Sequence, residues 1–182
     1  RVERVDVVGA ARLDGEGRIE ARSRNGQDLT RMFPELAALI DTCDGTPTTL
    51  DGELVAIDEA GVPRFGLLQQ RLNLTTAARI TRRAAEVPAT YIVFDVLYRG
   101  KQATTSETYD ERRDRLEAIK VAADGIMIGQ AYRDVPGADV FEAASTRGLE
   151  GVVAKRRAST YRPGARSTDW IKVKAFRTQE VV

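Results

Sequence analysis

The stretch W-I-K-V-K at residues 170–174 is the part of the chain that decides its fold and points to its chemistry. It is short and β-prone, and side chains alternate between the two faces of a strand. We therefore expect Lys172 and Lys174 to point to one face, and Ile171 and Val173 to point into a core. Two ammonium groups on one face form a receptor for an anion. Taken alone, the segment also suits an edge strand whose lysines prevent aggregation.

A second β-prone run, E-G-V-V-A-K at residues 150–155, contributes a carboxylate. The two runs together suit a phosphate and its metal ion, because Mg²⁺ prefers carboxylate oxygens and phosphates need cations. Lys155 and Glu150 are five residues apart and would point to opposite faces of a strand, so spacing does not place both side chains in one site. Trp170 is expected to pack in the core beneath the lysine strand.

Three more segments carry polar residues in places that call for a reason. The runs L-D-G-E-L-V-A-I at 50–57 and Y-I-V-F-D-V-L-Y at 91–98 hold acidic residues within apolar surroundings, which strand interiors disfavour. The run R-S-R-N-G at 22–26 is a polar turn, and the guanidinium of Arg24 could hold a phosphate or carboxylate through two bonds. An ordinary hairpin turn is the alternative interpretation.

In this order the segments resemble the nucleotidyltransferase (adenylation) domain of ATP-dependent DNA ligases, particularly the bacterial end-joining type. The resemblance covers almost the whole chain, and it rests on S-R-N-G (23–26), L-D-G-E (50–53), F-D (94–95), E-G-V-V-A-K (150–155), Y-R-P-G (161–164) and W-I-K-V-K (170–174). It implies an α+β fold of antiparallel β-sheets flanked by helices, the nucleotidyltransferase (ATP-grasp-like) domain of DNA ligases. The C-terminal OB-fold domain that follows in such ligases is not in this sequence.

The resemblance implies an ATP-binding ligase core that acts on nicked or broken DNA. Lys172 and Lys174 would stabilise the phosphates, and Glu150 would hold Mg²⁺ or Mn²⁺. Glu53 would bind the ribose or help to place the metal, with Asp51 as its structural neighbour. By residue type alone, Glu150 could instead be a strand-end carboxylate paired with an arginine.

The same resemblance assigns two further contacts to the nucleotide. Phe94 would stack on adenine, although a Phe in a buried strand is usually a core residue. Arg24 would contact a phosphate or the edge of the ribose. Asp6 would sit beside the nucleophile.

The chain departs from the family where that nucleophile should be. The family begins its active site with Lys-x-Asp-Gly-x-Arg, whereas residues 4–9 read R-V-D-V-V-G. The chemistry needs a neutral amine to attack the α-phosphate, and the guanidinium of Arg4 stays protonated. Either self-adenylation has been lost, or a modified lysine next to Arg4 is missing from the written sequence. The intact mass of the purified chain distinguishes these hypotheses.

Length and composition fit a single domain, and the resemblance implies one adenylation domain over residues 1–182, which we expect to be truncated at both ends. With 182 residues, 42% of them hydrophobic, the chain can form a real core. The net charge of +1 gives no global attraction to nucleic acid, so DNA contacts would need local basic patches. The candidates are Arg82-Arg83, Arg112-Arg113 and Lys155-Arg156-Arg157, each of which could also be a solvated face.

The single cysteine and the absence of histidine exclude several kinds of bond and catalytic site. Cys43 is the only cysteine, so no intrachain disulfide can form, and the absence of histidine excludes Ser-His or Cys-His catalysis. No long apolar segment suggests a membrane span. We expect a monomer in the bacterial cytoplasm, associated with the nucleoid.

Hydrophobic spacing predicts the remaining elements. We expect a hairpin over 5–13 and 18–24, a strand over 126–128, and helices over 33–43, 65–71, 76–86, 106–120 and 139–147. Leu36, Leu39 and Ile40 should lie on one side of the first helix, Ser106 should cap the fourth, and Gly148 should end the fifth.

Two other functions remain open at this point. Arg4, taken at face value, favours a non-catalytic nucleotide- or DNA-binding domain. A nucleotidyltransferase of the RNA ligase or capping type would keep the chemistry and change the substrate.

Overall fold

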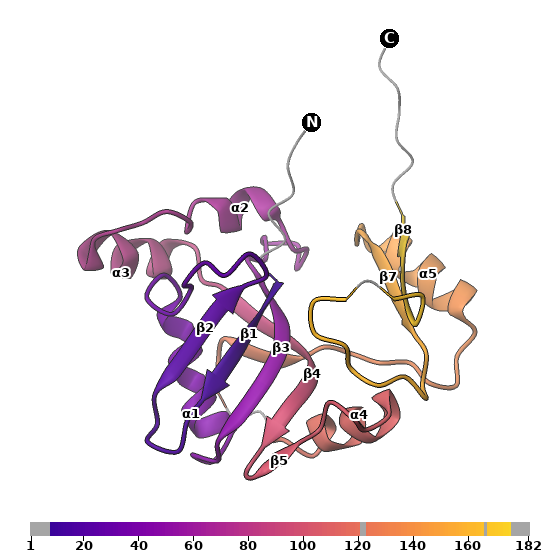
Figure 1. The fold of residues 1–182 in the computed structure, drawn as a ribbon. Helices are drawn as coiled ribbons and strands as arrows, with labels where there is room; N and C mark the ends of the chain where they lie inside the picture. Colours follow the sequence, from indigo (N-terminus) through magenta and orange to yellow (C-terminus); the bar gives the residue numbers. More distant parts are fainter. Residues whose placement is uncertain (1–7, 121–122, 166, 176–182) are drawn as a thin grey trace.

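The computed structural model describes residues 8–120, 123–165 and 167–175. Its strands form a main sheet of six and a separate ribbon of two, with helices around them (Figure 1). The main sheet contains β1 (Val8–Leu13), β2 (Ile19–Ser23), β3 (Thr48–Val55), β4 (Thr90–Arg99), β5 (Gln102–Ala103) and β6 (Ile126–Ile128), and the ribbon contains β7 (Gly151–Lys155) and β8 (Trp170–Lys174).

The helices are short. They are the 3₁₀ helix η1 (Pro34–Ala38) and the α-helices α1 (Leu39–Thr42), α2 (Phe65–Gln69), α3 (Ala77–Glu86), α4 (Tyr109–Glu117) and α5 (Gly137–Thr146). Within the described ranges, no helix has the length and apolar character needed to cross a membrane.

The main sheet is antiparallel except at one strand. Its order is β2-β1-β3-β4-β5, and β6 pairs in parallel with β4. A parallel pair needs a crossover connection, and here the chain passes through α4 before it returns as β6. The α+β fold with antiparallel sheets is thus confirmed, as is the hairpin of β1 and β2.

The core is one apolar cluster that joins the main sheet to η1 and α1. Leu50, Leu54 and Val93 from the strands are at most 2% exposed, as is Leu36 from η1. Ile40 is 37% exposed, so the prediction that it shares one side with the buried Leu36 and Leu39 was wrong. The predicted single helix begins with 3₁₀ geometry, which has three residues per turn and shifts the phase of the following residues.

The start of α4 differs from the prediction by two residues. Thr108 caps the helix, because its Oγ1 accepts a hydrogen bond from the Glu111 amide, and the Glu111 side chain accepts from the Thr108 amide in return. Ser106 is not the cap. The T-x-x-E spacing of this capping box was the sequence signal for the correct start.

Candidate functional site

A β-bulge in β4 places Phe94 outside the regular sheet pairing. Asp51 of β3 opposes Asp95, and the next residue, Gly52, opposes Val93, which leaves Phe94 without a partner of its own. Bulges of this kind redirect side chains and are frequent beside active sites. Phe94 is half-buried and is not part of the main core, whereas Val93 is 1% exposed within it.

Lys155 of β7 occupies the junction between Phe94 and the ribbon. Its Nζ lies 3.9 Å from the ring centroid of Trp170, 4.6 Å from that of Phe94 and 4.8 Å from that of Tyr109. This buried Nζ has no hydrogen-bond partner within the described part of the chain. Cation–π attraction to three rings is therefore the main direct contact of the ammonium group.

Burial lowers the pKa of Lys155 to about 8. The nearby carboxylates of Asp95 and Asp51 act in the opposite direction, since they favour the ammonium form. A lysine with such a pKa is partly neutral under mildly alkaline conditions.

The register of the ribbon places Lys155 on the same face as the two lysines of β8. Lys155 pairs with Trp170, Val153 with Lys172, and Gly151 with Lys174, and paired residues of an antiparallel ribbon share a face. The contact with Phe94 turns this face toward β4. The lysine face of the ribbon therefore lies toward the junction.

The other face of the ribbon is not a core. Ile171 is 55% exposed and Val173 is 41% exposed, so their predicted burial was wrong. The ribbon is a two-stranded sheet of its own, and none of its residues belongs to the main apolar cluster. Trp170 is half-buried and lies on the lysine face, with its ring against the Lys155 ammonium.

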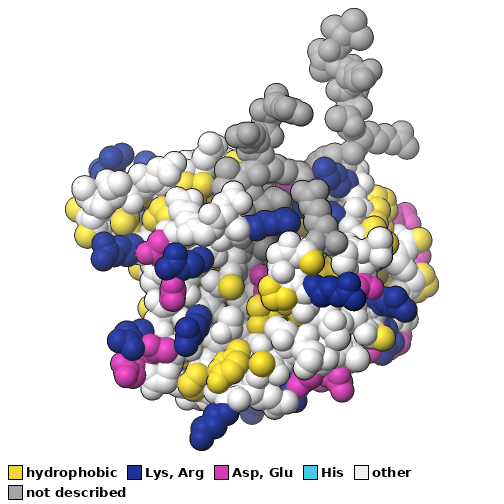
Figure 2. All heavy atoms as spheres, in the orientation of Figure 1, with side chains coloured by type: hydrophobic (Ala, Val, Ile, Leu, Met, Phe, Trp, Pro, Cys, Tyr) yellow, Lys and Arg dark blue, Asp and Glu magenta, His cyan; other side chains and the backbone are white. Residues whose placement is uncertain are grey.

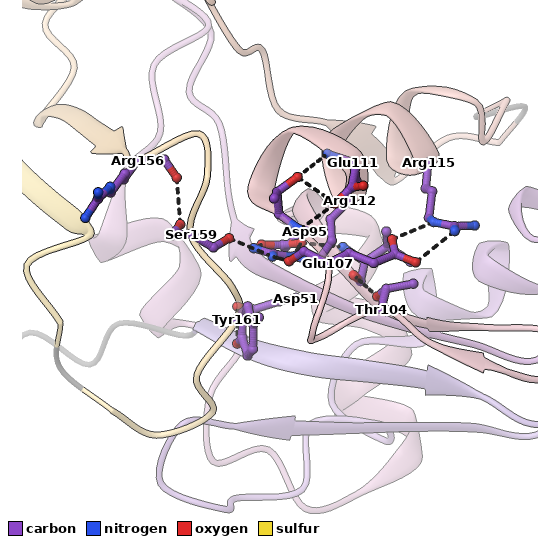
Figure 3. A network of polar contacts seen from close by, with 12 residues as sticks. Asp51, Asp95, Thr104, Glu107, Glu111, Arg112, Arg115, Arg156, Ser159 and Tyr161 are labelled. Atoms are coloured by element: carbon purple, nitrogen blue, oxygen red, sulfur yellow. Dashed lines mark hydrogen bonds and ion pairs between the residues drawn. The ribbon is translucent and has the colours of Figure 1, made fainter.

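Two acidic residues of the main sheet are fully engaged (Figure 3). Asp95 forms a buried bidentate pair with Arg112, with distances of 2.8 Å to Nε and 3.0 Å to Nη2. Tyr161 donates a hydrogen bond of 2.7 Å to Asp51. Burial raises the pKa of Asp51, and the Tyr161 bond partly offsets this effect.

These contacts hold the segment that leads out of β7 against α4. Arg112 also donates to the carbonyl oxygen of Ser159, and the Tyr161 amide donates to that of Thr105. The Tyr161 ring contacts Trp170 edge-on at 5.7 Å. Residues 156–161 thus form a strap that fixes the ribbon beside β4.

One proposed DNA patch, Arg112-Arg113, is buried, and the basic residues of another, Lys155-Arg156-Arg157, have partners within the chain. Arg112 is 0% exposed and Arg113 is 4% exposed, so this pair is not a phosphate-binding surface. Lys155 is likewise engaged in the junction. Arg156 and Arg157 are exposed, but each has a carboxylate partner, Asp169 at 3.6 Å and Asp110 at 2.6 Å respectively.

The predicted site residues divide between the two sheets. Glu53 lies on β3, and Arg24 is exposed directly after β2. Both lie at the same end of the main sheet, because Glu53 pairs with Val8, and Ser23 pairs with Gly9. Phe94 lies on β4 near this end.

The ribbon supplies the other group. Glu150 precedes β7, and its carboxylate lies 3.7 Å from the Lys172 ammonium. Lys174 shares a face with Lys172. Asp6 and Arg4 lie outside the described residues.

The carboxylates suit a hard divalent cation without forming a complete cage. In the described residues, no three His, Cys, Asp or Glu side chains converge on one point. Mg²⁺ usually keeps several waters and takes one or two carboxylates together with substrate phosphates. Glu150, beside the Lys172 ammonium, fits that chemistry.

Sequence reasoning missed Lys155 as a member of this site. It compared Lys155 only with Glu150 along one strand, whereas the cross-strand register relates it to Lys172. Arg112 was also missed, although the buried Asp95 required a cationic partner.

Comparison with known proteins agrees with this geometry. The family described as "ATP dependent DNA ligase domain" matches residues 9–174. The chain belongs to the ATP-dependent DNA ligase domain family. The match includes the bulged strand, the strap and both strands of the ribbon.

Relatives within this ligase family include end-joining proteins. The chain is 39% identical over 166 residues to the "Multifunctional non-homologous end joining protein LigD" of Mycolicibacterium smegmatis. It is 33% identical over 155 residues to a DNA ligase of Natronomonas pharaonis. The match covers 91% of this chain and 20% of the LigD protein, and 84% of this chain and 27% of the Natronomonas ligase.

Solved ligase structures share the fold. A mycobacterial DNA ligase D complexed with ATP and MES superimposes with a TM-score of 0.78 at 32% identity, over 93% of this chain and 52% of that one. The ligase domain of Mycobacterium tuberculosis LigD gives a TM-score of 0.75 at the same identity, over 92% and 51%. This chain thus spans about half of the solved ligase domains.

Proposed function

We propose that this chain is the adenylation core of an ATP-dependent DNA ligase of the LigD end-joining type. The observation that carries the proposal is the junction, where Lys155 on the Phe94 ring turns the Lys172 and Lys174 face of the ribbon toward β4. Family membership and the ATP complex of the related mycobacterial ligase D support the same function.

In this proposal the side chains of both sheets converge on ATP. Lys172 and Lys174 stabilise negative charge as it moves onto the leaving pyrophosphate. Phe94 stacks on adenine, and Arg24 binds a phosphate or the ribose edge. Glu53 binds the ribose or assists Glu150, which holds Mg²⁺ or Mn²⁺. The bound cation supplies charge neutralisation at the phosphate oxygens.

The reaction begins with attack of a neutral lysine amine on the α-phosphorus of ATP. A P–N bond forms, the bond to the β-phosphate oxygen breaks, and the amine loses a proton. AMP then passes to a 5′-phosphate at a nick or break, and a 3′-hydroxyl displaces it. An OB-fold domain would be the partner for complete sealing.

Arg4 is the residue on which the covalent step depends. In the sequence it stands at or next to the position of the family nucleophile, two residues before Asp6, and a guanidinium does not become a neutral nucleophile. Arg4 is the one observation behind a second function, in which the domain binds nucleotide or DNA without adenylating itself; the family match and the LigD relatives do not favour it.

One experiment separates the two functions. The chain is incubated with α-labelled ATP and Mg²⁺ or Mn²⁺, denatured and analysed for bound label. Covalent label supports the adenylation core, whereas binding without it supports the second function. Glu150→Gln and Lys172→Met should each reduce label by roughly 100-fold, as loss of a charge-stabilising group does. Lys101→Met, at an exposed position in the β4–β5 turn, is the matched control.

A further inference from the structure

Helix α3 is attached to the body through little apolar surface. Ile80 is the buried hydrophobic residue of its ten, with 9% exposure. The helix lies between α2 and β4, and Figure 1 shows it projecting at the upper left of the sheet. Most of its surface is therefore available to a partner.

Three arginines form a stripe along α3, which we call the arginine stripe: Arg79, Arg82 and Arg83. Residues three and four apart lie on one face of a helix, with Cβ atoms about 5–6 Å apart. Glu86 lies on the same stripe, at 2.8 Å from Arg83 and 3.6 Å from Arg82. Glu86 thus serves the guanidinium groups of Arg82 and Arg83, and no described carboxylate pairs with Arg79.

Among the exposed arginines, the stripe is a local cluster in which three guanidinium groups face one carboxylate, that of Glu86. Individual carboxylates pair with Arg18, Arg22, Arg64 and Arg115. The chain has 28 basic and 27 acidic residues, so the stripe is a local surplus in a nearly neutral molecule. Figure 2 shows basic side chains over this projecting part of the surface.

Arg79 does not serve the stability of the helix, whereas Arg82 and Arg83 each pair with Glu86. The first turn of α3 contains Arg79 and no acidic residue, and its N-cap makes no side-chain hydrogen bond. A cation in the first turn opposes the helix dipole. The charge arrangement is better explained by an anionic partner.

We infer that the arginine stripe of α3 binds the phosphate backbone of duplex DNA beside the reacting end. This inference rests on the proposed function. Guanidinium groups bind phosphate oxygens bidentately, and a row of them matches a regularly charged strand. A protein partner would need apolar anchors, whereas no large hydrophobic side chain within residues 58–97 is exposed.

The position of α3 fits this assignment. The helix ends at Glu86, and β4 begins at Thr90 and leads to Phe94. In Figure 1, α3 and β8 both lie in the upper part of the molecule, with α3 on the left and β8 on the right. DNA held near the lysine face could extend across that part to α3.

The test compares two triple variants with equal loss of charge. The first is Arg79→Gln, Arg82→Gln and Arg83→Gln, and the control is Arg18→Gln, Arg22→Gln and Arg64→Gln, which removes paired arginines. Anisotropy of a labelled nicked duplex gives Kd at several KCl concentrations. We expect the first variant to bind DNA roughly tenfold more weakly than the wild type. The slope of the logarithm of the binding constant against the logarithm of the KCl concentration should become shallower by about 2, and the control should change little.

Three outcomes overturn the inference. The wild type and the stripe variant could show the same salt slope, or the wild type could fail to bind DNA. In the third, polyglutamate displaces the labelled duplex from the wild type as effectively as unlabelled DNA does. The triple Arg→Lys variant should keep the slope, and thermal melting should match the wild type. Covalent label from ATP is measured in parallel and should be the same in all variants. If the wild type binds DNA but acquires no covalent label from ATP, the proposed function is contradicted and the inference about the arginine stripe is not.

Discussion

The ammonium group of Lys155 lies 3.9 Å from the centroid of the Trp170 ring, and the two residues are cross-strand partners in the ribbon. This contact joins the ribbon to β4, because the same ammonium group lies over Phe94. A cation is therefore buried between the two sheets that carry the candidate site.

The charge of Lys155 should make stability depend on pH. Its pKa is about 8 in the folded chain and 10.5 when exposed, so the unfolded chain binds more protons between these values. Stability from this group then rises with pH across that window, by about 2–3 kcal/mol between pH 7 and 10. Urea unfolding of wild type and Lys155→Met should show the difference, and a gap that is constant with pH would contradict it.

Removing one partner of the Asp95–Arg112 pair alone should cost more stability than removing both partners would suggest. Both side chains are 0% exposed, and Asp95→Ala leaves a buried guanidinium without its carboxylate. We expect a loss of about 3–5 kcal/mol in the free energy of unfolding. The double variant Asp95→Ala and Arg112→Met should lose less than the sum of the single variants. Additive losses in chemical denaturation would show that the pair is not coupled.

Tyr161→Phe should raise the pKa of Asp51. The Tyr161 hydroxyl donates a 2.7 Å hydrogen bond that favours the carboxylate, while burial already favours the neutral acid. Titration of the Asp51 carboxyl by NMR measures the change, and stability should fall by about 1–3 kcal/mol. An unchanged or lower pKa would mean that the bond does not stabilise the charge.

Thr108→Ala should destabilise the chain by about 1 kcal/mol, because it removes the cap of α4. Ser106→Ala is the matched control, since Ser106 lies two residues before the cap and should change little. Thermal melting of both variants is sufficient. Equal effects would argue against the capping box.

Local pattern predicted much of this fold. The sequence indicates β-prone runs at 150–155 and 170–174, and strands form there at Gly151–Lys155 and Trp170–Lys174. The end of α5 was expected at Gly148, which has a φ of 71°. These features depend on alternation and on backbone freedom over a few residues.

The rest depends on contacts between distant segments. The bulge at Phe94 arises from the register between β3 and β4, and the partner of Asp95 lies 17 positions away on α4. Lys155 belongs to the site because it pairs with Trp170 across the ribbon. The spacing of residues along one strand holds no information about this pairing. The assigned roles of Arg24, Glu53, Glu150, Lys172 and Lys174 stay predictions.

Gly9 stands where the family motif Lys-x-Asp-Gly-x-Arg ends in arginine. The close pairing of β1 with β2 determines how an arginine could be restored at this position. A Cβ atom on residue 9 would collide with the carbonyl oxygen of Arg22 on the neighbouring strand. Any larger residue there must push the first two strands apart before it can contribute chemistry. An engineer who rebuilds the ligase signature must therefore redesign that backbone first, and a lineage that adopted glycine here would face the same barrier to reversal.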